Sequence, residues 1–328
     1  MTQISRPLLL GLLTAAIVIL AAVSLSAGKV WIPFSAWVHA ANDPRWLIIF
    51  ELRLPRTILA VAVGMALGLS GAALQGYTRN PLADPGVLGV SSSAAFGAVV
   101  TLYFGFAATQ AWILPAGAMI GAVGGVLVLL ALSGGAMSIM TFVLAGVVLN
   151  TVAGAGVALA LSLAPDPWAV NEIINWLMGS LADRSVDEVR MAVPFIVVGC
   201  GLLLTTGRAL DALTIGEVGA RSLGVSLGTT RLLLAAGVGF AAGASVAVTG
   251  VVGFVGLIVP HLLRPWVGAR PGALLLPSAL AGAVILLAGD IAVRLTPSAV
   301  ELRIGVAMAA LGGPFFLALL INMRRRAA

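Results

Sequence analysis

Long apolar segments separated by short polar ones dominate this chain. The charge-free segments Pro7–Gly28 and Thr57–Thr78 each match the length of one membrane-spanning helix. Pro85–Pro165 carries no charged residue and is long enough for three spans of about 20 residues with their turns. A short helix at Trp168–Leu181 is expected to lie along the membrane surface, and Met191–Gly207 forms the next span. This part of the chain therefore predicts six spans.

The last third of the chain predicts four more spans. Leu232–Leu263 should fold back as one full span and one shorter span, followed by Pro271–Gly289 and Ile304–Met323. Ten spans place both termini on one side, and the tail Arg324–Arg326 indicates the cytoplasm. We predict an all-α integral membrane protein with ten transmembrane helices, cytoplasmic N- and C-termini and a single domain over residues 1–328.

Composition agrees with this class. Apolar residues make up 60% of the chain and charged residues 9%, well below the roughly one quarter of a soluble domain. The first apolar segment is longer than a signal-peptide core, so we expect it to be a retained span. The net charge of +6 indicates lipid headgroups rather than nucleic acid, because no basic cluster is interleaved with aromatic residues. The single cysteine, Cys200, lies inside an apolar run, which excludes an intrachain disulfide.

The 40 glycines indicate closely packed helices. Pairs spaced four residues apart, which permit close helix crossings, occur at Gly64–Gly68, Gly117–Gly121 and Gly239–Gly243. The tripeptide Glu-Leu-Arg precedes both the second and the tenth span, at Glu51–Arg53 and Glu301–Arg303. Such an echo is compatible with a duplicated transporter and also with chance.

The longest polar interruption in the second half is Arg208–Arg231. As a helix, it would place five residues on one face: Leu213, Gly216, Ala220, Leu223 and Leu227. Glu217 and Arg221 would form an i,i+4 pair on another face, and Gly224 and Gly228 would break or bend the helix. The small-residue stripe would let another protein approach the backbone closely. The alternative is a solvated loop that joins two spans.

Catalytic chemistry is sparse. His39 and His261 have no second metal ligand at suitable spacing, and Lys29 lacks the flanking residues of a phosphate-binding loop. Asp290 lies at the edge of a span, four residues before Arg294, which predicts an ion pair within one helix, with a proton relay as the alternative. The span centres lack the charged residues of an ion-coupled carrier. A transport function would therefore take its energy from another chain.

Six stretches carry a resemblance to a known family. They are LRLPRTILAVAVGMALGLSGAALQGYTRNPLADPGVLGV (52–90), WLMGSLAD (176–183), LDALTIGEVGARSLGV (210–225), GFVGLIVPHLLR (253–264), GDIAVRL (289–295) and ELRIGVAMAALGGPFFLALL (301–320). In this order they resemble the permease subunits of ABC importers for iron–siderophores, haem and cobalamin. The resemblance implies the ten-helix, BtuC-like fold of a type II importer in the cell inner (cytoplasmic) membrane.

The resemblance also implies partners. The family assembles two permeases, two cytoplasmic ATPase subunits and a periplasmic or lipid-anchored substrate-binding protein. ATP and Mg²⁺ would bind the ATPase subunits, so we expect no cofactor, no metal site and no catalytic residue in this chain. Membrane lipid would surround the assembly. The second permease subunit would be another copy of this chain, although a sibling permease is the alternative.

Functional residues carry over by position. The family's coupling helices, which dock on the ATPase, correspond to about 208–230, and the match covers Asp211, Leu213, Gly216, Glu217, Ala220, Leu223 and Gly224. Outer arginines that meet carboxylates of the binding protein correspond to Arg53, Arg56 and Arg294. The inner constriction corresponds to Asn80, Pro81 and Leu82 and, by a looser match, to Ser138 and Ile139. Many relatives have proline at the position of Arg303, which could join the docking surface or meet Glu301 or a headgroup.

The substrate and two other classes of protein stay open. A ferric siderophore is the commonest cargo of the family, and haem or cobalamin are the alternatives. A gradient-driven secondary transporter would act without an ATPase, and the lack of charged residues in mid-span argues against it. A membrane scaffold or an enzyme of lipid metabolism would need a convergent polar site, which the sequence does not indicate.

Overall fold

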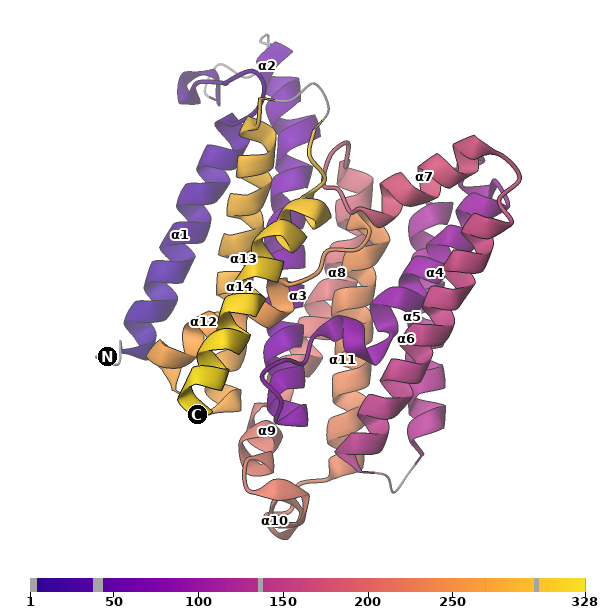
Figure 1. Cartoon of the computed structure of the whole chain (residues 1–328). Helices are drawn as coiled ribbons and strands as arrows, with labels where there is room; N and C mark the ends of the chain where they lie inside the picture. The colour runs from indigo at the N-terminus through magenta and orange to yellow at the C-terminus, as the bar shows by residue number, and fades with distance from the viewer. Residues whose placement is uncertain (1–4, 38–43, 135–137, 269, 298–300, 328) are drawn as a thin grey trace.

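The computed structural model describes residues 5–37, 44–134, 138–268, 270–297 and 301–327, and these residues contain helices but no β-strand. The long helices are α1 (Arg6–Ser26), α3 (Leu54–Thr78), α5 (Ile113–Ser133), α6 (Ile139–Ser162), α8 (Val186–Thr205), α11 (Leu227–Thr249), α13 (Pro271–Leu295) and α14 (Ile304–Ala327). Two shorter apolar helices are α4 (Val90–Tyr103) and α12 (Val255–Val267). They form one bundle (Figure 1).

Short helices connect these elements. They are η1 (Phe34–Trp37), α2 (Pro44–Leu47), the π-helical η3 (Ile48–Arg53), η4 (Pro85–Leu88), η5 (Phe106–Ala108), α7 (Pro167–Leu177), α9 (Gly207–Leu213) and α10 (Gly216–Ser222). α9 and α10 protrude at one end of the bundle, here called the α10 end, and α7 crosses the opposite end, called the α7 end (Figure 1). The first turn of α1 and the last turn of α14 both lie toward the α10 end. The predicted lateral helix is thus α7.

Each predicted span corresponds to one helix. Seven stretches of the described chain are helical, long and apolar enough to cross a membrane: α1, the continuous helix Arg45–Thr78, α5, α6, α8, α11 and α13. The other three predicted spans are the shorter apolar helices α4, α12 and Ile304–Leu319 of α14. The all-helical membrane architecture is confirmed. The count of ten crossings and the cytoplasmic side of the termini stay predictions.

Three helices form the centre of the bundle. In the most apolar windows of α3 and α11, 78% of residues are buried, and in α13 61%, against 11% in α1 and 28% in α6. The outer helices expose large apolar side chains such as Val18 and Val152, as surfaces facing lipid do. α3, α11 and α13 are therefore the buried helices of the bundle, and they position the polar residues at its two ends.

Glycine pairs allow the central helices to cross closely. A Cβ atom built on Gly64 of α3 would lie 2.4 Å from the carbonyl oxygen of Gly282 in α13. Gly68 contacts α13 one turn further along, whereas Gly117–Gly121 packs against α4 and Gly239–Gly243 against α5. All three predicted small-residue faces are therefore helix crossings within this chain.

Candidate functional site

The predicted coupling stretch forms two short helices rather than one. α9 ends at Leu213 and α10 begins at Gly216, whose φ of +94° requires a left-handed backbone that glycine adopts without strain. Gly224 has φ +81° and ends the stretch, as predicted. Gly228 instead lies inside α11, so the predicted break there is wrong.

The predicted face of the coupling stretch divides between the bundle of this chain and the molecular surface. Leu213 and Ala220 have no exposed surface, whereas Ile215, Val218 and Leu223 are 64%, 78% and 65% exposed. The face was expected to meet another protein. Leu213 and Ala220 instead pack against this chain, because α9 and α10 fold against the first turns of α13 and α6, whereas Leu223 of the same predicted face is exposed. The apolar surface open to a partner, which we call the α10 apolar face, is formed by Ile215, Val218 and Leu223.

Two acidic residues of the stretch contact the first turns of long helices. Asp211 accepts a hydrogen bond from the Gly272 backbone N–H at the start of α13 (2.8 Å) and pairs with Arg270 at 3.3 Å. Glu217 accepts a hydrogen bond from the Ile139 N–H at the start of α6 (3.1 Å) rather than pairing with Arg221 as expected. Neither carboxylate is directed toward the α10 apolar face.

The loop after α3 has a defined turn. Arg79 adopts a left-handed conformation (φ +51°) that ends α3. The Asn80 side-chain oxygen accepts a hydrogen bond from the Leu82 N–H (3.0 Å), which closes the turn around Pro81. Asp84 follows and accepts from the Gly86 N–H (2.9 Å), and burial raises the pKa of the Asp84 carboxyl.

The two predicted constriction segments line one cavity. Asn80 and Leu82 from the loop after α3 and Ser138 and Ile139 from the start of α6 surround a cavity of about 340 Å³, together with Glu217 of α10. Pro81 lines a neighbouring cavity of about 390 Å³ instead. The structure thus brings one coupling residue beside four of the five predicted constriction residues.

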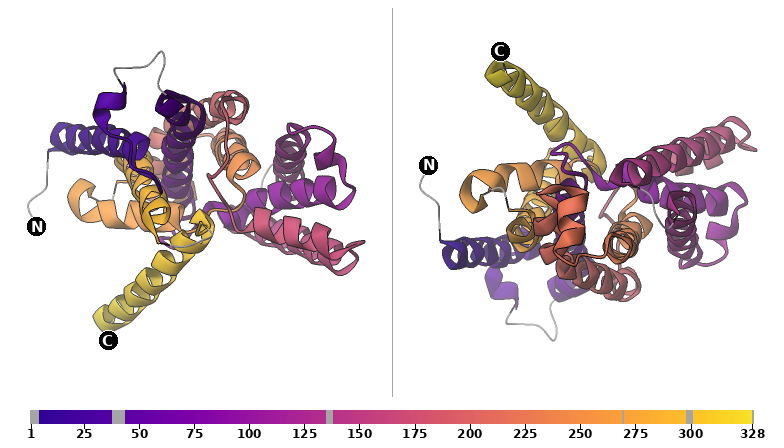
Figure 2. Two further views of the ribbon diagram at one scale, coloured as in Figure 1. Left: turned by 90° about the horizontal axis from the view of Figure 1, so that it is seen from above. Right: turned by 90° about the horizontal axis from the view of Figure 1, so that it is seen from below.

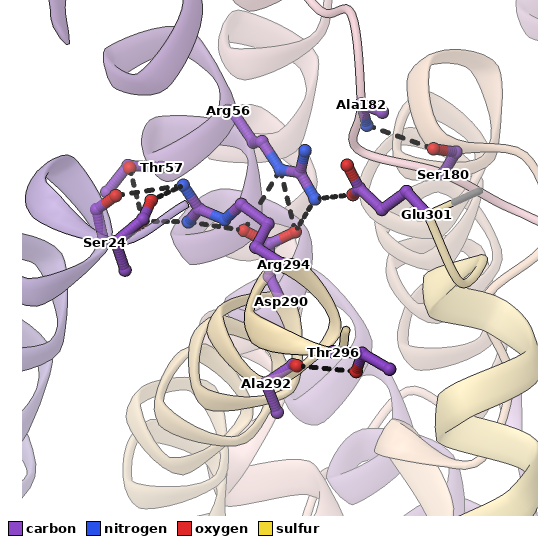
Figure 3. A network of polar contacts seen from close by, with 11 residues as sticks. Ser24, Arg56, Thr57, Ser180, Ala182, Asp290, Ala292, Arg294, Thr296 and Glu301 are labelled. Carbon is purple, nitrogen blue, oxygen red and sulfur yellow. Dashed lines mark hydrogen bonds and ion pairs between the residues drawn. The ribbon is translucent and has the colours of Figure 1, made fainter. Parts of the chain in front are cut away.

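At the α7 end, two arginines share one buried aspartate (Figure 3). Arg56 of α3 donates from Nε (2.9 Å) and Nη2 (2.7 Å) to Asp290 Oδ1, and its Nη2 also contacts Glu301. Arg294 Nη2 lies 2.7 Å from Asp290 Oδ2, which confirms the predicted ion pair within α13. Asp290 has no exposed surface. Its charge is therefore balanced entirely by this network.

Arg294 of this network and Arg53 hold the C-terminal end of α1. Arg294 donates to the Ser24 carbonyl oxygen (2.9 Å) and contacts the Ser24 hydroxyl. Arg53 donates to the carbonyl oxygens of Leu25 (3.0 Å) and Val30 (2.6 Å). Cations at a helix C-terminus compensate its unpaired carbonyl groups and its negative dipole end.

The three predicted docking arginines are thus neighbours, but they point inward. Their exposed fractions are 8%, 8% and 7% for Arg53, Arg56 and Arg294, and each guanidinium has partners in this chain. All three arginines and Glu301 line a cavity of about 200 Å³ at the α7 end. Their role in docking stays a prediction. Arg303 donates to Asn175 of α7 (3.3 Å).

Comparison with known proteins shows which family this chain belongs to. A model described as the FecCD transport family matches residues 16–322. The chain belongs to the FecCD transport family.

Relatives of this FecCD chain match it over nearly its whole length. It is 37% identical to the vitamin B12 import system permease protein BtuC of Klebsiella pneumoniae, over 98% of this chain and 96% of the relative. It is 38% identical to the hemin transport system permease protein HmuU of Yersinia pestis, over 99% and 98%. A solved structure described as an inward-facing conformation of a metal-chelate type ABC transporter aligns with a TM-score of 0.87 and 32% identity, covering 96% of this chain and 99% of that one.

Sequence reasoning missed one functional candidate in this FecCD chain. Arg231, five residues into α11, is 5% exposed and donates to the backbone carbonyls of Ser133 (3.3 Å) and Gly134 (2.8 Å) at the end of α5. The only signal in the sequence was an arginine at the start of an apolar helix. An arginine at that position is equally typical of an anchor in the lipid headgroup region. The sequence therefore does not predict the contact between Arg231 and the end of α5, which depends on the tertiary structure.

Proposed function

We propose that this chain is the membrane-spanning permease subunit of an ATP-driven importer, which carries a metal chelate delivered by a substrate-binding protein. The family and the named functions of the relatives support a transport subunit. The observation that carries the proposal is the α10 apolar face. It protrudes beyond the bundle and exposes three large apolar side chains at the end toward which the first turn of α1 and the last turn of α14 lie.

The proposal includes three kinds of partner. Two cytoplasmic ATPase subunits, which hold ATP and Mg²⁺, dock at the α10 ends of a pair of permeases in the inner membrane. The binding protein docks at the α7 end. The proposed second copy of this chain packs beside α14, which projects away from the other helices (Figure 2) and exposes Leu311 and Leu317.

The cargo belongs to the class of metal chelates. The two relatives are named for vitamin B12 and hemin, and a ferric siderophore is the third member of the class. Uptake into liposomes that hold the permease, its ATPase and its binding protein, with one probe of each kind, identifies the cargo. Uptake driven by a proton or sodium gradient with no ATPase present would overturn the proposal.

Docking on the ATPase is tested at the α10 apolar face. Val218→Asp places a charge where an apolar side chain becomes buried, and burying such a side chain contributes about 1.5–3 kcal/mol. We expect co-purification of the ATPase subunit to fall by at least about tenfold. Glu172→Ala, an exposed change on α7, is the matched control and should leave co-purification unchanged. An active complex with Val218→Asp would remove this face from the docking surface.

A further inference from the structure

The cavity that Pro81 lines is enclosed mainly by three helices at the α10 end. α3, α12 and α13 supply most of its wall, and the turn between α9 and α10 adds Thr214. Its position at this end follows from α13, whose first turn contacts α9 through Gly272 and Asp211. The volume of about 390 Å³ lies within the range of sites for small ligands.

The cavity carries positive charge without a matching acid. Arg79 at the end of α3 and Arg264 in α12 both line it, and none of the described residues of its wall is acidic. In the part of the chain that the structure describes, neither guanidinium forms an ion pair. Arg79 also lines the neighbouring cavity that holds Glu217, but that carboxylate accepts a hydrogen bond from the first turn of α6. An anion is therefore the ligand that this cavity would favour.

A buried glutamine holds Arg264 in place. Gln75 of α3 is 4% exposed, and its Nε2 donates to the carbonyl oxygens of Gly256 and Leu257, each at 3.3 Å. Its Oε1 consequently accepts from Arg264 Nη2 at 2.7 Å. The amide is neutral, so it orients the guanidinium and leaves the charge of Arg264 unbalanced.

The opposite side of α12 has the character of a surface at the level of lipid headgroups. α12 lies at the periphery of the bundle (Figure 2). Leu262 and Trp266, spaced four residues apart, are 42% and 39% exposed on one side of it, and tryptophan is typical of the membrane–water interface. Arg264 lies between them in sequence and contacts α3 instead. The cavity thus borders a helix whose outer side suits contact with lipid.

We propose that this cavity binds the phosphate group of an anionic phospholipid, with Arg79 and Arg264 as its ligands and Gln75 as the positioning residue for Arg264. A guanidinium matches phosphate with two parallel N–H groups. Basic cavities between membrane helices bind such headgroups. The inference needs only the membrane architecture of the chain, so it does not depend on an ATPase or on a cargo.

The test is native mass spectrometry of the full-length permease purified in detergent. Phosphatidylglycerol, whose headgroup carries one negative charge, is titrated against the protein. Phosphatidylcholine, whose headgroup has no net charge, is the reference lipid. We expect the parent to bind one phosphatidylglycerol at least about tenfold more tightly than phosphatidylcholine, the factor that one charge-assisted hydrogen bond supplies.

Two variants remove one charge each. Arg264→Gln should weaken the binding of phosphatidylglycerol about tenfold, while its amide can still donate to Gln75 and preserve the packing. Arg79→Gln, at an exposed position, should give a similar loss. Arg264→Lys should retain part of the affinity, because it keeps the charge but not the paired N–H groups. Arg208→Gln, an exposed change at the same end outside the cavity, is the matched control and should bind like the parent.

Four results would overturn the inference. They are equal affinities for the two lipids in the parent, unchanged affinity for phosphatidylglycerol in both glutamine variants, and a loss in Arg208→Gln as large as in Arg264→Gln. The fourth is displacement of phosphatidylglycerol by an equal concentration of inorganic phosphate, which would assign the cavity to free anions. Intact lipid binding by Arg264→Gln with loss of ATPase co-purification would instead assign Arg264 to docking on the ATPase. All of these results leave the proposed function standing.

Discussion

At the scale of single residues, the buried charges of this chain are matched to specific partners. Asp290 has no exposed surface and receives Arg56 and Arg294, while Glu301 adds a second carboxylate on Arg56. These residues come from α3, α13 and the segment before α14, so the network joins parts of the chain far apart in sequence (Figure 3). Removing one member leaves uncompensated charge inside the protein.

Asp290→Ala tests this balance. We expect it to destabilise the protein by about 3–5 kcal/mol, because two buried guanidinium groups lose their counter-charge. The measurement is the apparent melting temperature of the purified permease in detergent. Asp187→Ala removes an exposed ion pair with Arg190 and should cost no more than about 1 kcal/mol. Equal melting temperatures for the two variants would contradict a structural role of the network.

At the scale of elements, the close approach of the central helices depends on glycine, which has no side chain. α3 and α13 cross where Gly64 faces Gly282, and the carbonyl oxygen of one residue occupies the space that a Cβ atom on the other would need. Packing without a hydrophobic driving force relies on such contacts in a membrane. The same principle applies where Gly117–Gly121 of α5 meets α4.

Gly64→Ala should therefore force α3 and α13 apart. A Cβ atom 2.4 Å from a backbone oxygen cannot be accommodated by side-chain movement, so we expect a loss of about 1–3 kcal/mol. Gly154→Ala in α6 is the matched control, since nothing lies within 4 Å of its Cβ position and alanine favours a helix by up to about 1 kcal/mol. The measurement is the thermal unfolding of both variants. A Gly64→Ala protein as stable as the parent would contradict the close crossing of α3 and α13.

At the scale of the whole molecule, the two ends of the bundle differ in their surfaces and in the placement of their charged residues. The α10 end presents an apolar face on short protruding helices, with charged residues behind it that hold long helices. The α7 end gathers Arg53, Arg56 and Arg294 beneath its surface, around a small cavity. In the proposed importer, the α10 end would transmit force from the ATPase and the α7 end would recognise the binding protein.

Docking at the α7 end can be separated from stability. If carboxylates of the binding protein reach the small cavity, Arg53→Gln should lower stimulation of ATP turnover by the binding protein about tenfold, as loss of one charged contact does, with basal turnover intact. The measurement is the ATPase rate of the reconstituted complex with and without binding protein. Equal loss of basal and stimulated turnover would assign Arg53 to holding α1 alone.

The sequence by itself determined the helices and the family. The spacing between charged residues sets the length of each apolar segment. Inside a membrane every such segment must form its backbone hydrogen bonds internally, so the sequence predicts helices. The motif LDALTIGEVGARSLGV located α9 and α10, and the glycine pairs marked three helix crossings. All of these features depend on residues close together in the chain.

Only the tertiary structure decided which way side chains face. Leu213 and Ala220 face inward, unlike Leu223 of the same predicted face, because α9 and α10 fold against the first turns of α13 and α6, whose unpaired N–H groups attract Asp211 and Glu217. Arg53 and Arg294 turned inward because the last carbonyl groups of α1 lie beside them, and Arg56 turned inward toward Asp290. Helix ends attract charge at short range, and which end lies beside which residue depends on contacts distant in sequence.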